Sequence, residues 1–85
     1  MSRRVEWAKR AFKELGRLDR PTQKRIVAAV YELASTNQGD VRRLQGSEDE
    51  AFRLRVGDWR VILSFQGDGS MLVLRVSPRG DAYKG

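Results

Sequence analysis

The chain has 85 residues, 40% of them apolar, and a formal net charge of +6. This length allows one domain with a small core, so we expect a single domain over residues 1–85. The sequence contains no cysteine and no histidine, which excludes disulfides, thiolate metal sites and the commonest general base. We therefore expect no metal and no cofactor.

Charge, apolar runs and the lack of cysteine together indicate where the protein acts and which class of partner it binds. The first ten residues are charged and lack an apolar core, so we expect no signal peptide. We also expect no membrane span, because no apolar run approaches the required length of about 18 residues. The absence of cysteine suits a reducing cytoplasm. A basic surface favours nucleic acid, anionic lipid or an acidic protein, and the alternative is an ordinary solvated surface.

The first part of the chain has helical periodicity after one short extended segment. Residues 3–8 are predicted as a strand, because Val5 and Trp7 share one side with period two. A helix is predicted over residues 8–17, with an apolar stripe of Ala8, Ala11, Phe12 and Leu15.

A second helix is predicted from the segment after Leu18. Asp19 can cap its first turn, and Pro21 is tolerated there because the missing N–H has no intrahelical partner. We expect the helix to end between Thr36 and Gly39, and to pack beside the first helix as a hairpin. Its apolar stripe comprises Ile26, Val30, Leu33 and Ala34.

The last third of the chain changes to strand periodicity. Strands are predicted over residues 51–56, 59–65 and 71–77, with a loop over 66–70 and Pro78 ending the last strand. The order is therefore β-α-α-β-β-β. This order predicts an α+β fold, in which the helical hairpin packs on one face of a mostly antiparallel sheet.

The first predicted hairpin turns at Gly57 and Asp58, which suit a type II′ turn. This register pairs Arg55 with Arg60. Alternation then places the following residues on the helix side: Phe52, Leu54, Val56, Trp59, Val61, Leu63 and Phe65. A second turn at Gly67 and Asp68 would pair Arg60 with Arg75 and direct Leu72, Leu74 and Val76 to the core. A slip of one residue would reverse these assignments.

The uncovered side of the sheet is predicted to carry Arg53, Arg55, Arg60, Arg75 and, if the chain stays extended, Arg79. Like charges placed opposite one another destabilise a sheet. The pattern therefore favours an anion-binding face, although a merely solvated face is the alternative.

Several arginines around one phosphodiester suit cleavage of RNA. Guanidinium groups bind phosphate oxygens in bidentate fashion, and an aligned ribose 2′-OH could attack the phosphorus without a metal. Tyr83 could transfer a proton or stack on a base, or it could simply pack at the sheet edge. Asp58 is another candidate for proton transfer, and its alternative role is that of a turn residue.

Five segments together resemble the RelE/ParE superfamily of bacterial toxins, on the RelE side. They are "WAKRAFKELGRL", "QKRIVAAVYEL", "DVRRLQG", "FRLRVGDWRVIL" and "LRVSPRGDAY". The resemblance implies a RelE-like fold and an endoribonuclease that cuts messenger RNA on the ribosome and inhibits translation. It places the family's catalytic positions on Arg53, Arg55, Arg60, Arg79 and Tyr83. Arg75 and Asp58 are expected to contact RNA.

Two departures from the family pattern bear on mechanism. Some members have lysines at the positions of Arg53 and Arg55, which leaves the general base open here. Many members have a histidine where this chain has Pro78, so a histidine-based mechanism is excluded.

The resemblance also implies a partner, a small antitoxin that covers the toxin and often assembles with it as a heterotetramer. Apolar helix residues could form its docking surface or belong to the core, namely Phe12, Leu15, Val30 and Tyr31. Two other functions stay open: a ParE-like toxin that inhibits DNA gyrase without nuclease activity, and a non-catalytic RNA-binding or co-repressor module.

Overall fold

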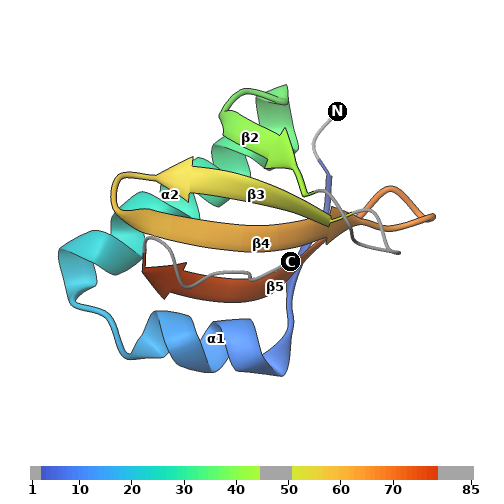
Figure 1. Ribbon diagram of the computed structural model, residues 1–85. Coiled ribbons are helices and arrows are strands. Elements are labelled where there is room, and N and C mark those ends of the chain that lie inside the picture. Colours follow the sequence, from blue (N-terminus) through green and yellow to red (C-terminus); the bar gives the residue numbers. More distant parts are fainter. Residues whose placement is uncertain (1–2, 45–50, 79–85) are drawn as a thin grey trace.

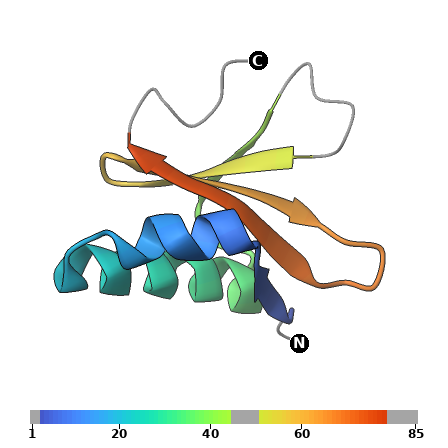
Figure 2. The ribbon, with the colours of Figure 1, turned by 90° about the horizontal axis from the view of Figure 1, so that it is seen from below.

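Two helices pack on one face of a five-stranded sheet in the computed structural model, which describes residues 3–44 and 51–78 (Figures 1 and 2). Three neighbouring strand pairs are antiparallel, and the fourth pair, β1 with β5, is parallel. The sheet order is β1-β5-β4-β3-β2. The elements are β1 (Val5–Trp7), α1 (Lys9–Gly16), α2 (Arg20–Thr36), β2 (Asp40–Arg43), β3 (Ala51–Val56), β4 (Trp59–Phe65) and β5 (Met71–Pro78).

This architecture confirms the predicted α+β class, with one strand more than predicted. The additional strand is β2, which pairs with β3 at the edge of the sheet. Only Val41 of its four residues is apolar and turned toward the core, so local periodicity gives a weak signal. Pairing with β3 therefore decides its conformation.

Helix α2 begins and ends as its sequence predicts. The Asp19 carboxylate accepts hydrogen bonds from the Thr22 backbone N–H at 3.4 Å and from the Thr22 hydroxyl at 2.6 Å. These bonds, the hydroxyl first, hold the pKa of Asp19 below its ordinary value. Asn37 ends the helix with a left-handed φ of 63°, and its N–H donates to the Leu33 carbonyl.

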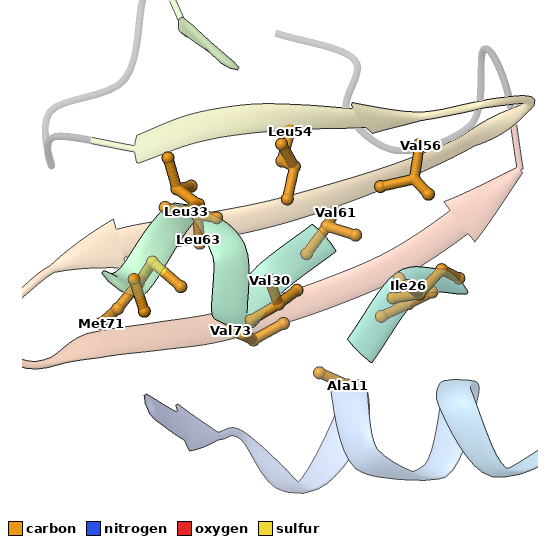
Figure 3. Close-up of a cluster of buried hydrophobic side chains, with 12 residues drawn as sticks. Ala11, Ile26, Val30, Leu33, Leu54, Val56, Val61, Leu63, Met71 and Val73 are labelled. Atoms are coloured by element: carbon orange, nitrogen blue, oxygen red, sulfur yellow. The ribbon is translucent and has the colours of Figure 1, made fainter. Parts of the chain in front are cut away.

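The core lies between the helices and the sheet, where the apolar stripe of α2 meets β3, β4 and β5 (Figure 3). All four predicted stripe residues of α2 are buried, and so is Ala11 of α1. Phe12, which is predicted to lie in the apolar stripe of α1, is instead 67% exposed. In the described part of the chain, neither helix combines the length and apolarity needed to cross a membrane.

The second hairpin departs from the predicted register. Phe65 pairs with Met71, so residues 66–70 form a wider loop than a two-residue turn. The Ser70 hydroxyl and backbone N–H both donate to Asp68, which stabilises this wider loop. A further shift occurs between Ile62 and Leu63.

These two shifts decide which residues of β5 face the helices. Met71 and Val73 are fully buried in the main core, in place of the predicted Leu72 and Leu74. Leu74 instead packs against a smaller cluster of Ala51 and Ile62. The second shift restores the predicted inward direction of Val76, which is 3% exposed.

Candidate anion-binding site

Four arginines gather on the sheet face opposite the helices, and we call them the arginine cluster. They line a hollow of about 250 Å³ together with Asp40. Three adjacent strands contribute them: Arg42 from β2, Arg53 and Arg55 from β3, and Arg60 from β4.

The β3–β4 turn produces most of this convergence. Gly57 has a φ of 59°, a left-handed value that suits the first central position of a type II′ turn. The register is the predicted one, with Arg55 opposite Arg60 and Arg53 opposite Ile62. Alternation then directs Arg53, Arg55 and Arg60 away from the helices, as predicted.

The arginine cluster has few close partners in the part of the chain that the structure describes. Within residues 3–44 and 51–78, none of its guanidinium groups has a carboxylate oxygen within 4 Å. The Arg60 guanidinium instead folds over the turn, where Nη1 donates to the carbonyls of Gly57 and Trp59, both at 3.1 Å. Guanidinium groups without a close carboxylate in the described part of the chain suit an anion such as phosphate.

Strand β2 contributes two side chains that are not among the predicted site residues. Arg42 lies opposite Arg53, and Asp40 lies opposite Arg55. Asp40 and Arg42 are two positions apart, with Val41 facing inward between them. This alternation of polar and apolar residues is the sequence pattern from which the strand could have been predicted. Asp40 adds a carboxylate to the hollow, which is a possible acceptor for a proton.

The prediction that Arg75 pairs with Arg60 is wrong, because of the register shifts in β5. Ser77 takes the place opposite Arg60, and Arg75 lies opposite Ile62. The Arg75 guanidinium donates to the Glu14 carboxylate of α1, with Nε and Nη2 each 3.1 Å from Oε2. Arg75 therefore does not line the hollow, and the geometry gives no support to its predicted contact with RNA.

Ser77 is a buried polar residue beside the arginine cluster. It is 3% exposed, and its hydroxyl has no hydrogen-bond partner among the residues that the structure describes. Its position opposite Arg60 places it next to the site. The sequence alone predicts no role for it, because a serine before a strand-ending proline has no distinctive pattern.

The remaining predicted site residues are Asp58, Arg79 and Tyr83. Asp58 lies exposed in the β3–β4 turn and does not line the hollow, so its predicted roles stay predictions. Arg79 and Tyr83 lie outside the described residues. In the described ranges, no group of three or more acidic side chains comes together to form a metal site.

The fold and the arginine cluster together define a small α+β protein with a basic hollow on one sheet face. Comparison with known families gives the class a name. A model described as the ParE toxin of a type II toxin–antitoxin system, parDE, matches residues 5–83. The chain therefore belongs to the RelE/ParE superfamily of type II toxin–antitoxin toxins.

Individual relatives are of the RelE type. A curated protein of Methanocaldococcus jannaschii, named "Putative toxin RelE1", is 35% identical over 86 residues, covering 94% of this chain and 93% of that protein. The RelE–RelB complex from Pyrococcus horikoshii contains a chain with a TM-score of 0.78 and 32% identity, covering 96% of this chain and 100% of that one. The free Escherichia coli RelE mutant has the same fold, with a TM-score of 0.71 at 18% identity, covering 95% of this chain and 86% of that one.

Proposed function

We propose that this toxin is an endoribonuclease of RelE type that cuts messenger RNA on the ribosome. The observation that carries the proposal is the set of guanidinium groups of Arg53, Arg55 and Arg60 on the sheet face opposite the helices, which have no carboxylate within 4 Å among the described residues. Such groups match the oxygens of a phosphodiester and would stabilise the charge that develops during its cleavage. The identity of 35% and 32% to two RelE-type relatives supports the same function.

The proposed reaction needs only the RNA and protein side chains. The ribose 2′-OH attacks the adjacent phosphorus while the bond to the 5′ oxygen breaks, which gives a 2′,3′-cyclic phosphate and a 5′-OH. The arginines hold the phosphate in line with the 2′ oxygen and supply the positive charge that a metal would otherwise provide.

Two protons must move in this reaction, one from the 2′-OH and one to the leaving 5′ oxygen. Asp40 is the carboxylate that lines the hollow, which makes it a candidate base. Tyr83 stays the candidate from the family resemblance, as does Arg79 for phosphate binding. The site of action would be the cytoplasm, where ribosomes are.

We further propose that an antitoxin neutralises this protein. The complexes from Pyrococcus horikoshii and Methanococcus jannaschii each pair a RelE chain with RelB. Of the four helix residues considered for docking, Val30 is buried and Leu15 packs on the core, whereas Phe12 and Tyr31 are 67% and 47% exposed. An acidic antitoxin segment would suit the net charge of +6. A mass measurement on the complex would test the expected heterotetramer.

A ParE-like gyrase inhibitor is the second candidate, because the matching family model is described as a ParE toxin. Such a protein would bind its target without cleaving RNA. A gyrase inhibitor would not need the arginine cluster for catalysis, and for this reason it is the second candidate.

Mapping of messenger 5′ ends after a short pulse of expression separates the two candidates. New ends inside translated codons are expected from the wild type, and none from folded Arg60→Ala, which should also relieve growth arrest. Arg4→Ala is the control, because Arg4 is exposed and pairs with Glu6 and Asp68 away from the site. Intact messages with DNA damage would favour gyrase, and full toxicity of Arg60→Ala would defeat the proposed role of the arginine cluster.

A further inference from the structure

A second set of positive charges covers the helical layer, and we call it the helical basic band. All of its members are exposed. They come from α1, the connection after it and the first turns of α2: Lys9, Arg10, Lys13, Arg17, Arg20, Lys24 and Arg25.

The carboxylates within this stretch are engaged elsewhere. Glu14 binds Arg75 and the backbone of β5, and Asp19 caps α2 through Thr22. Only Arg10 in the band has a carboxylate within 4 Å among the described residues, and that contact to Glu14 is 3.8 Å long. The band therefore carries nearly all of its charge unpaired.

The band has a regular geometry along α1. Lys9, Lys13 and Arg17 are spaced four residues apart, which places them on one side of the helix about 6 Å apart along its axis. They line a hollow of about 490 Å³ together with Arg10 and Glu14, whose carboxylate is held by Arg75 and β5. Phe12, 67% exposed on the same helix, adds an aromatic ring on which a base could stack.

Arg25 connects the band to the arginine cluster around one end of the sheet. Its Nη2 lies 2.8 Å from the position that a Cβ on Gly57 would occupy. Arg60 donates to the carbonyl of the same glycine. The start of α2, the end of α1 and the β3–β4 turn all lie at this end of the molecule (Figure 1).

We infer that the helical basic band binds the phosphate backbone of the RNA outside the linkage held at the arginine cluster. The inference rests on the proposed function, because it takes the same RNA as the ligand of both surfaces. An RNA chain has one negative charge per nucleotide, so the phosphates flanking the cleaved linkage need further cations. The cations of the band, with Arg25 beside the turn that carries Arg60, would meet that need without reading sequence.

Binding of an RNA that cannot be cleaved tests this inference. A labelled single-stranded RNA with 2′-O-methyl groups throughout would be titrated at several salt concentrations, with fluorescence anisotropy as the readout. Lys13→Gln/Arg17→Gln should bind more weakly at low salt. Loss of two phosphate contacts should make the slope of log K against log salt shallower by about 1.4, at about 0.7 per contact.

Arg3→Gln/Arg4→Gln is the matched control, because it removes the same net charge near β1, and its slope should stay at the wild-type value. Equal slope changes in both variants would show that only net charge matters and would overturn the inference. The inference would also be overturned if Lys13→Gln/Arg17→Gln bound the RNA as tightly as the wild type does, whether or not it bound an acidic antitoxin peptide more weakly. Failure of the wild type to bind the RNA would overturn it as well. A protein without nuclease activity that still shows the band-specific slope change would defeat the proposed function and leave this inference standing.

Discussion

The Glu14 carboxylate binds the guanidinium of Arg75 across the boundary between α1 and β5. The same carboxylate accepts a hydrogen bond from the Val76 backbone N–H at 2.8 Å. Strand β1 pairs with β5 only as far as Val73, so the N–H of Val76 has no strand partner on that edge. Glu14 supplies the missing acceptor and fixes α1 against the sheet.

Removal of this carboxylate should destabilise the fold. Glu14→Ala is expected to lower the free energy of unfolding by about 2 kcal/mol, because it leaves a backbone donor and a half-buried guanidinium without an acceptor. Glu14→Gln should lose about half as much, since its amide oxygen can still accept from Val76. Urea denaturation would measure both. Glu32→Ala, at an exposed position of α2, is the control, and equal stability of the two alanine variants would contradict this account.

The β3–β4 turn should require glycine at its first central position. Gly57→Ala is expected to cost about 1–2 kcal/mol, because its φ of 59° is strained for an alanine and the new Cβ would meet the Arg25 guanidinium. Gly67→Ala should be nearly neutral, because a Cβ there meets nothing within 4 Å and φ is not in the left-handed region. Thermal denaturation of both variants checks this, and equal melting temperatures would exclude the proposed strain.

Two equally buried serines should respond differently to loss of the hydroxyl. Ser70 and Ser77 are each 3% exposed, but only the Ser70 hydroxyl has a partner among the described residues, the Asp68 carboxylate. Ser70→Ala should therefore lower the free energy of unfolding by about 1 kcal/mol. Ser77→Ala should leave it unchanged or raise it. A larger loss for Ser77→Ala in denaturant titrations would mean that its hydroxyl is bonded in solution.

Asp68 should contribute stability that disappears in acid. Hydrogen bonds from the Ser70 hydroxyl and N–H, with the charge of Arg4, hold the pKa of Asp68 below its ordinary value of 3.8. A carboxyl with a lowered folded-state pKa stabilises the fold fully above its unfolded value, and this contribution is lost as pH falls through the folded value. Asp68→Asn should therefore melt below the wild type at about pH 7 and converge with it at about pH 2. An equal gap at both pH values would argue against this assignment.

The first hairpin could be predicted because its determinants are local. Gly57 and Asp58 specify the turn, and the alternation of Leu54 and Val56 with Arg53 and Arg55 specifies the faces. Three members of the arginine cluster follow from these two facts alone. This part of the candidate site therefore depends on residues within a few positions of one another.

The rest of the site depends on contacts between distant segments. Strand β2 is held by β3, so Asp40 and Arg42 were missed with it. The second hairpin depends on how Ser70 binds Asp68 and on a register shift inside the sheet, neither of which has a clear sequence pattern. That shift, together with Glu14 from α1, accounts for the misplacement of Arg75.

Single-turnover cleavage of messenger RNA on purified ribosomes tests the central claim most directly. We predict that the wild type cuts the message and that folded Arg60→Ala does so at least about 100-fold more slowly, because the variant lacks one of the guanidinium groups proposed to stabilise the phosphate. Arg4→Ala should cut at the wild-type rate. Cleavage by Arg60→Ala at the wild-type rate would contradict the claim that the arginine cluster holds the scissile phosphate.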